Sequence, residues 1–310
     1  MRHEDSTEIH DHDRGLNHDL ETMAHRVVER RRLLGLFGAG GVAALLTACG
    51  GGDSSGSSSG STTTTTTTGT GTTTTTGTTT TTTGTSTTAS SCVADPSETN
   101  GPFPSDGTNS VNGTISNVLT ATGIVRSDIR SSFGTSTNTA PGVPLVLTIK
   151  VVNTNSSCAN LEGYAVYVWH CTRDGNYSLY SSGVQNENYL RGVQVTNANG
   201  EITFTTIYPG CYSGRWPHIH FEVFPSLATA TTQRNAALTS QFAMPQDISS
   251  AVYNGDSGYS ASIRNLAAIT IASDGVFGDN TSAQITAMTP TLAGSVASGF
   301  TGSVVVGLAR

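Results

Sequence analysis

Residues 210–220 have the sequence Gly-Cys-Tyr-Ser-Gly-Arg-Trp-Pro-His-Ile-His, and this stretch decides how the chain is interpreted. A Pro-Gly turn opens it, and its last three residues alternate between histidine and an apolar side chain. Successive side chains of a β-strand point to opposite faces, so His218 and His220 would project together from one face, with Ile219 on the other. The stretch therefore predicts a strand that presents two imidazoles side by side.

Two tyrosines accompany this histidine pair. Tyr212 lies upstream in the same stretch, and Tyr177 follows a similar turn formed by Gly175 and Asn176. A phenolate is a hard oxygen donor, which suits ferric iron far better than zinc or copper(I). We therefore predict an iron site with two tyrosine and two histidine ligands: Tyr177, Tyr212, His218 and His220.

The other histidines contribute little to this prediction. Of the eight histidines, five lie within residues 1–25, and the rest are His170, His218 and His220. His170 is the last residue of a predicted strand and precedes Cys171. We expect His170 to be structural and the neighbouring Trp169 to belong to the core.

The N-terminal segment, residues 1–48, has the features of an export signal. Three arginines at 30–32 precede an apolar run that is too short for a comfortable membrane span. The arginines followed by two leucines fit a twin-arginine signal, and Leu46-Thr-Ala-Cys49 has the form of a lipobox. We expect cleavage before Cys49, its lipidation, and anchoring on the outer side of the cytoplasmic membrane or in the outer membrane.

Residues 49–91 follow as a Gly/Ser run and a nearly pure Thr/Gly tract. Such a composition cannot bury enough apolar surface to offset the entropy of ordering, so we interpret it as a tether. Residues 92–310 are long enough for one well-packed domain. The net charge of −7 and the absence of a basic motif argue against a nucleic-acid partner.

Cysteine usage fits an exported protein. Besides Cys49, the chain contains Cys92, Cys158, Cys171 and Cys211. An even number of cysteines in an oxidising compartment predicts two disulfides, and the sequence leaves their pairing open.

The pattern of apolar and turn residues predicts an all-β domain, an antiparallel β-sandwich with long loops that carry the metal site. A turn-rich link at 197–200 indicates a hairpin. A short helix is predicted at 233–241. The predicted strands are 144–152, 163–170, 192–196, 201–207, 218–224, 267–271 and 302–308.

From Cys92 onward the chain resembles the intradiol ring-cleavage dioxygenases, the family of protocatechuate 3,4-dioxygenase and catechol 1,2-dioxygenase, and especially its compact exported members. The resemblance runs through five segments, of which the last is the most specific: Thr99-Asn-Gly-Pro-Phe103, Val168-Trp-His170, Asp174-Gly-Asn-Tyr177, Leu190-Arg-Gly192, and Phe204-Thr-Thr-Ile-Tyr-Pro-Gly210 leading into His218-Ile-His220. The segment between Tyr212 and His218 is shorter than in the best-known cytoplasmic members, and their helical N-terminal domain is absent.

The resemblance implies an enzyme that cleaves a catechol with O2 between its two hydroxylated carbons, giving a muconate-type diacid. It implies a mononuclear ferric ion, Fe(3+), held by the four ligands already named. Tyr212 would leave the metal when substrate binds and act as a general base. Arg215 would stabilise negative charge on the substrate ring, and Gln241, in Thr239-Ser-Gln241, would lie near the substrate.

Two alternatives stay open at this stage. The domain could be a non-catalytic β-sandwich binding module on a surface stalk. It could also be a hydrolase or oxidase that uses the histidine pair with zinc or copper, which would need ligands other than two tyrosines. The sequence does not identify the catechol or the oligomeric state.

Overall fold

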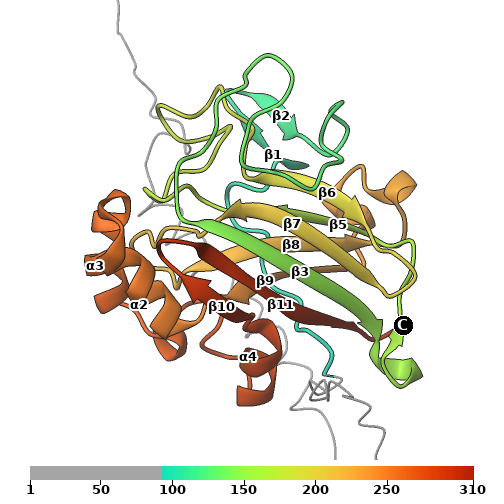
Figure 1. Cartoon of the computed structure of the whole chain (residues 1–310). Helices are drawn as coiled ribbons and strands as arrows, with labels where there is room; N and C mark the ends of the chain where they lie inside the picture. The colour runs from blue at the N-terminus through green and yellow to red at the C-terminus, as the bar shows by residue number, and fades with distance from the viewer. Residues whose placement is uncertain (1–92) are drawn as a thin grey trace, which may run out of the picture. The chain divides into compact units, whose positions relative to one another are not determined.

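The computed structural model describes residues 93–310. The predictions of an export signal at 1–48, a tether at 49–91 and a lipidated Cys49 therefore lie outside the described residues, as does Cys92. The described part of the chain is dominated by two β-sheets, with a small β-hairpin and a group of short helices beside them (Figure 1).

The larger sheet has the strand order β10–β11–β3–β4, and β7 pairs with β3 beside β4, on the edge of β3 that faces away from β11. Its long strands are β3 (Pro144–Asn153) and β11 (Gly299–Leu308). These two run parallel to each other, which departs from the antiparallel pairing expected from the sequence. The remaining strands of this sheet are β4 (Ala159–Asn160), β7 (Glu201–Ile207) and β10 (Thr291–Ser295).

The smaller sheet has the order β6–β5–β8–β9, and its neighbouring strands are antiparallel. It contains β5 (Ala165–Trp169), β6 (Arg191–Val195), β8 (His218–Phe224) and β9 (Leu238–Ala243). The hairpin is formed by β1 (Asp106–Val111) and β2 (Thr114–Asn117).

The main core lies between the two sheets. From the larger sheet it takes alternate residues of β3, such as Leu147 and Ile149, and from the smaller sheet it takes alternate residues of β8, such as Phe221. Phe221 stacks on Phe242 of β9 with ring centroids 4.3 Å apart. Two sheets that enclose a shared apolar layer form a β-sandwich, so the predicted fold class is confirmed.

The outer face of the smaller sheet is covered as well. Every residue of β8 is buried, including the alternate positions that point away from the main core. A second apolar cluster lies on that side and contains Trp169, Tyr177 and Tyr212. The smaller sheet is thus buried on both faces, and its outer face is where the polar residues of β8 lie.

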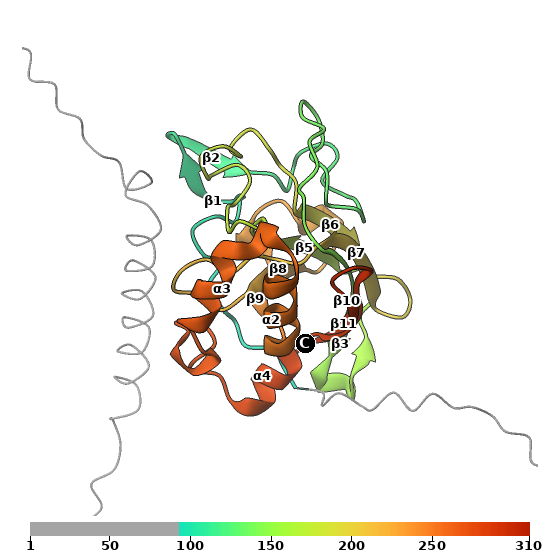
Figure 2. The ribbon, with the colours of Figure 1, turned by 60° about the vertical axis from the view of Figure 1, so that its left-hand side comes forward.

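The helices follow β9 in the chain. They are α2 (Gln246–Gly255), α3 (Ser260–Ala267) and α4 (Ser282–Met288), and they gather at one side of the sandwich (Figures 1 and 2). Short 3-10 turns link the elements: Thr154–Ser156, Leu227–Thr229, Gln233–Asn235, Ser257–Tyr259 and Ile271–Ser273.

Most of the predicted strands are confirmed. The strands predicted at 201–207 and 218–224 have the predicted bounds, and those at 144–152, 163–170, 192–196 and 302–308 differ by a few residues. The strand predicted at 267–271 is wrong, because these residues end α3 and begin a 3-10 turn that Thr270 caps by accepting from the Ser273 N–H at 3.1 Å.

Two further predictions are also wrong. The helix expected at 233–241 is a single 3-10 turn followed by β9. The hairpin expected across 197–200 does not form, because β6 pairs with β5 while β7 pairs with β3. The chain crosses from one sheet to the other at this turn, and such a crossing uses the same turn residues as a hairpin.

The prediction of two disulfides is corrected as well. Cys158 is disulfide-bonded, whereas Cys171 and Cys211 are buried free thiols. The Cys171 thiol donates to the Gly210 carbonyl at 3.4 Å, and the Cys211 thiol lies 3.5 Å from the Arg215 carbonyl. Burial raises the pKa of each thiol to about 12, which keeps both protonated and unreactive.

Within residues 93–310, no helix combines the length and the apolar character that crossing a bilayer requires.

Candidate metal centre

The outer face of the smaller sheet carries both histidines of the His-x-His pair. On β8, His220 is paired with Trp169 of β5 on one side and with Gln241 of β9 on the other. Ile219 points into the main core. The alternation of β8 therefore places His218 and His220 on the face opposite that core.

Both predicted tyrosines reach the same place from loops. The Tyr212 hydroxyl lies 3.1 Å from Nε2 of His218, and the Tyr177 hydroxyl lies 3.4 Å from the same nitrogen. Nε2 of His220 lies 3.0 Å from Nε2 of His218. Two phenol oxygens and two imidazole nitrogens thus converge on one point, and all four side chains are buried.

These distances fit a metal ion between the four donors. Metal–nitrogen and metal–oxygen bonds are about 2.0–2.2 Å long, so two donors at right angles about an ion lie about 3 Å apart. His218 has the tautomer that such a site needs, because its Nδ1 lies 2.5 Å from the Trp216 carbonyl and donates its proton there. Nε2 of His218 is left with a free lone pair, directed at the other donors.

His220 is held mainly by packing. Its ring stacks on Trp169 with centroids 4.7 Å apart and an interplanar angle of 6°. Gly101 also approaches the ring, since a Cβ at that position would lie 3.2 Å from Cε1 of His220. Trp169 is core, as expected, and also forms one wall of the site. Nδ1 of His220 has no hydrogen-bond partner among the described residues.

The two tyrosine loops pack closely against each other. A Cβ on Gly175 would lie 3.1 Å from Cβ of Tyr212, and one on Gly210 would lie 2.7 Å from the Thr172 carbonyl oxygen. Glycine at both positions lets the turn before Tyr177 lie directly on the segment that precedes Tyr212. The close approach explains how residues far apart in sequence bring their hydroxyls to one site.

Burial sets the protonation of the donors. It raises the pKa of Tyr212 to about 12, with nearby Arg215 acting in the opposite direction, and it raises the pKa of Tyr177 well above its usual value. Burial likewise lowers the pKa of His218 to about 3 and that of His220 well below the usual range. The site without a cation therefore holds neutral phenols and neutral imidazoles, and a bound cation would favour the phenolates.

Arg215 and Gln241, the predicted substrate-side residues, lie next to each other. Nη2 of Arg215 donates to Oε1 of Gln241 at 2.7 Å, and Nε2 of Gln241 donates to the Thr99 carbonyl at 2.9 Å. Both side chains are buried. Nε of Arg215 donates to Asp274 at 3.0 Å in a buried ion pair.

His170, expected to be structural, has structural contacts. Its Nε2 lies 2.7 Å from the Thr206 hydroxyl, and its Nδ1 lies 2.8 Å from the Cys171 carbonyl. Both ring nitrogens are engaged away from the four donors. Burial lowers the pKa of His170 to about 4, so the ring is neutral.

Two other polar residues, Asp274 and Arg191, shape the site without a sequence pattern that marks them as functional. Asp274 lies far along the chain from Arg215, so no local motif identifies it. Arg191 was noted only as part of a motif. It donates from all three of its nitrogens, to Ser178, Tyr167 and the backbone carbonyls of 103, 104 and 178. Arg191 begins β6 of the smaller sheet, so these bonds connect the segments at 103–104 and at 178, next to Tyr177, to that sheet.

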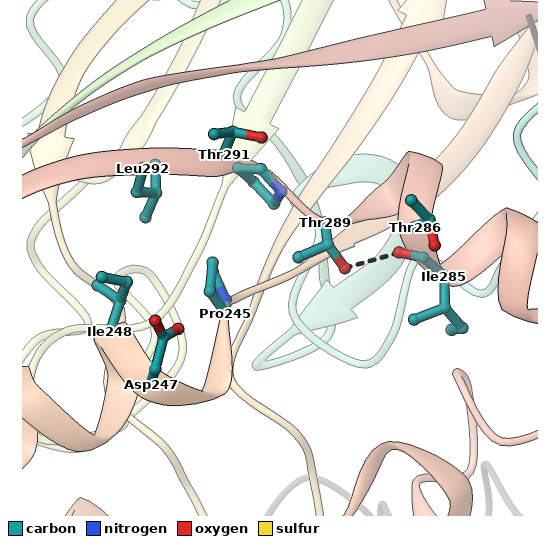
Figure 3. A pocket seen from close by; sticks show the side chains of 9 residues that line it. Pro245, Asp247, Ile248, Ile285, Thr286, Thr289, Thr291 and Leu292 are labelled. Atoms are coloured by element: carbon teal, nitrogen blue, oxygen red, sulfur yellow. Dashed lines mark hydrogen bonds between the residues drawn. The ribbon is translucent and has the colours of Figure 1, made fainter. Parts of the chain in front are cut away.

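Other features of the described residues offer no competing metal site. No three or more His, Cys, Asp or Glu side chains in that part of the chain are grouped to hold a metal ion. A surface pocket lies elsewhere, between the start of α2, the end of α4 and β10, and Asp247, Thr289 and Leu292 line it (Figure 3).

Comparison with known proteins identifies similar chains. Residues 127–259 match a family model described as a dioxygenase, and this range contains the four donors, Arg215 and Gln241. Chlorocatechol 1,2-dioxygenase from Rhodococcus opacus is 38% identical over 58 residues, which is 19% of this chain. The match spans only 23% of that curated relative's length.

Solved structures extend the similarity to most of the described residues. An intradiol ring-cleavage dioxygenase from Tetranychus urticae has 23% identity and a TM-score of 0.52, covering 70% of this chain and 95% of that one. A second dioxygenase crystal structure has 22% identity and a TM-score of 0.50, covering 70% of this chain and 94% of that one. At this identity the likeness concerns the fold. Together with the family match, it confirms that the chain resembles the intradiol ring-cleavage dioxygenases.

Proposed function

We propose that the protein is a non-haem ferric dioxygenase that cleaves a catechol-type ring between its two hydroxylated carbons. Both atoms of O2 enter the product, a muconate-type diacid. The observation that carries the proposal is the meeting of two phenol oxygens and two imidazole nitrogens, with the other three donors 3.0–3.4 Å from Nε2 of His218. The similarity to a chlorocatechol 1,2-dioxygenase supports a catechol as the substrate class.

Tyr177, Tyr212, His218 and His220 would hold the ferric ion. With the ion held by these residues, the site would supply Lewis-acid chemistry that favours a deprotonated catechol and makes its ring reactive toward O2. The two phenolates reduce the net charge of the centre and thereby stabilise the ferric state.

Proton transfer is assigned to Tyr212. As a phenolate, its oxygen would take one proton from an incoming catechol and become a neutral phenol, because burial raises the pKa of Tyr212 to about 12. Tyr177 is less exposed than Tyr212, at 2% against 8%, and would therefore be the tyrosine that keeps its place as a ligand. Arg215 lies within the same buried region and would stabilise negative charge on the substrate.

The proposal is tested with iron-loaded protein, catechol and labelled dioxygen. The expected result is one equivalent of muconate-type diacid carrying both labelled atoms. Tyr177→Phe and His220→Ala should abolish product formation, whereas Tyr208→Phe should retain it. Tyr208 is the matched control, because it is also a buried tyrosine but bonds Ser249 at 2.7 Å instead of facing the donors. A wild-type protein that binds iron and yields no diacid from any catechol tested would refute the proposal.

We also propose that the protein is exported and held at a membrane through a lipid on Cys49, as the lipobox and tether in the sequence favour. Metabolic labelling with a fatty acid tests this directly. The wild-type chain should carry the label and fractionate with membranes, and Cys49→Ala should lose both properties. An unlabelled wild-type chain would contradict the anchor without affecting the proposed reaction.

A further inference from the structure

Asp274 connects a late segment of the chain to the candidate metal centre. It follows the 3-10 turn Ile271–Ser273 and is 3% exposed. Its Oδ2 accepts from Nε of Arg215 at 3.0 Å and from the Trp216 N–H at 2.7 Å. Its Oδ1 accepts from the N–H groups of Val276 and Phe277 at 2.8 and 3.0 Å. Both carboxylate oxygens are therefore fully engaged, and the carboxylate has little freedom to rotate.

This contact fixes the orientation of the Arg215 guanidinium. A guanidinium is planar and carries N–H donors on Nε, Nη1 and Nη2 in a rigid fork. Asp274 takes Nε and Gln241 takes Nη2, so the direction of Nη1 is determined as well. The Phe277 ring lies 6.0 Å from the guanidinium carbon, and its own backbone is held by Asp274.

Nη1 of Arg215 is the unused arm of this fork. It is buried and has no hydrogen-bond partner anywhere in residues 93–310. An unpaired buried donor costs free energy, more so when it carries charge, and therefore calls for a physical explanation. A bound ligand with an anionic oxygen would satisfy it.

The same carboxylate also supports a metal donor. Asp274 holds the N–H of Trp216, and the carbonyl of Trp216 accepts the Nδ1 proton of His218 at 2.5 Å. Asp274 thus fixes two neighbouring residues, one on the substrate side and one behind a metal-directed imidazole. Burial alone would raise the Asp274 pKa, but Arg215 and the backbone donors outweigh it and lower the pKa, so the group is a carboxylate at neutral pH.

We propose that Asp274 is a positioning residue that orients Arg215 so that its Nη1 is reserved for a negatively charged oxygen of the bound substrate. The inference rests on the proposed function, which supplies a catecholate as that substrate. It predicts that Asp274 acts through Arg215 and is not merely a support for the fold. A mutant cycle separates these two roles.

The cycle compares wild type, Asp274→Asn, Arg215→Gln and the double variant, each loaded with ferric iron. Asp279→Asn is the matched control, since it removes an exposed carboxylate from the same segment.

Removing one preorganised donor from an oxyanion costs about 100-fold in kcat. We expect Arg215→Gln to lower kcat/KM about 100-fold and Asp274→Asn at least 10-fold, with the double variant no worse than Arg215→Gln alone. The substrate-free absorption band of the iron-loaded variants should stay at the wild-type position, because an asparagine oxygen at 274 can still accept from the Trp216 N–H that lies behind His218. Independent losses that multiply in the double variant would overturn the proposal.

A measurement on metal-free protein keeps the inference separate from the proposed function. The Nε proton of Arg215, observed in 15N-correlated NMR spectra, should exchange slowly with solvent in wild type and in Asp279→Asn. In Asp274→Asn its exchange should be fast. If protection survives in Asp274→Asn, the positioning role is wrong, whatever the reaction is. If Asp274→Asn does not fold, wild type loaded with diamagnetic gallium(III) is titrated with catechol. A shift of the Arg215 Nη1 signal supports the proposal, and an unchanged signal overturns it.

Discussion

Replacing Gly101 with alanine should weaken metal binding, because Gly101 lies against a proposed metal ligand. Its φ is +71°, a region that L side chains rarely adopt. The added methyl would lie 3.2 Å from Cε1 and 3.7 Å from Nε2 of His220. The ring also stacks on Trp169, with centroids 4.7 Å apart, and this packing restricts its movement. The substitution therefore combines backbone strain with a close steric contact that would displace the His220 imidazole.

The two effects can be separated with Gly113→Ala. Gly113 has a similar φ of +75°, and a Cβ there would meet nothing within 4 Å. A left-handed conformation costs an alanine about 1–2 kcal/mol, so both variants should lose that much unfolding free energy without metal. Disturbing what supports a metal ligand typically costs about 10–100-fold in affinity. We therefore expect Gly101→Ala alone to bind iron at least about 10-fold more weakly, equivalent to about 1.4 kcal/mol.

The assay pairs urea unfolding of the metal-free variants with iron binding measured by competition against a chelator. Binding to the folded state raises the unfolding free energy, so the stabilisation by metal should be smaller in Gly101→Ala than in Gly113→Ala. Equal iron affinity in the two variants would refute the reasoning, because the steric contact with His220 would then have no consequence. A much larger stability loss in Gly113→Ala would refute the estimate of strain.

Three further predictions concern stability and thiol chemistry. Burial raises the pKa of Asp95 from 3.8 to about 7, and the hydrogen bond from the Gly307 N–H opposes this only in part. Between about pH 4 and pH 7 the folded protein therefore keeps a proton on Asp95 that the unfolded chain loses. Unfolding free energy should therefore fall as pH rises from about 4 to about 7, by at most about 4 kcal/mol, and Asp95→Asn should flatten this dependence in urea titrations. Arg191→Lys should lower the unfolding free energy by about 3–5 kcal/mol, because a lysine ammonium cannot replace a guanidinium that donates from Nε, Nη1 and Nη2. Unchanged stability would contradict the structural role of Arg191. Finally, Cys171 and Cys211 should titrate with a thiol reagent only after denaturation, and unreactive denatured protein would mean that they pair.

The sequence predicts the strands best where one face alone is apolar or where turn residues bound a β-branched run. The strand 201–207 has alternating exposure, and its predicted bounds are those of β7. β9 was missed because it is buried on both faces, and its outward-facing residues include Gln241, so no period of two is visible. The run at 267–271 is rich in β-branched residues, but Thr270 caps a 3-10 turn there instead.

The candidate ligands were accessible from sequence because three of them lie within one short stretch. Tyr212, His218 and His220 are spaced so that a turn and a strand bring them together, and Tyr177 follows a comparable turn. Asp274 had no such signal, because its relation to Arg215 arises only when the segment after α3 folds back. The hydrogen bond from His218 to the Trp216 carbonyl was equally hidden, since backbone acceptors leave no trace in the sequence.

The visible absorption spectrum of the iron-loaded protein tests the central claim most directly. Two tyrosinate ligands should give a charge-transfer band that shifts when catechol is added without O2. The band should be altered in Tyr177→Phe and unchanged in the buried-tyrosine control Tyr208→Phe. A protein that binds ferric iron without such a band, or a band that survives the loss of both Tyr177 and Tyr212, would contradict the proposed centre.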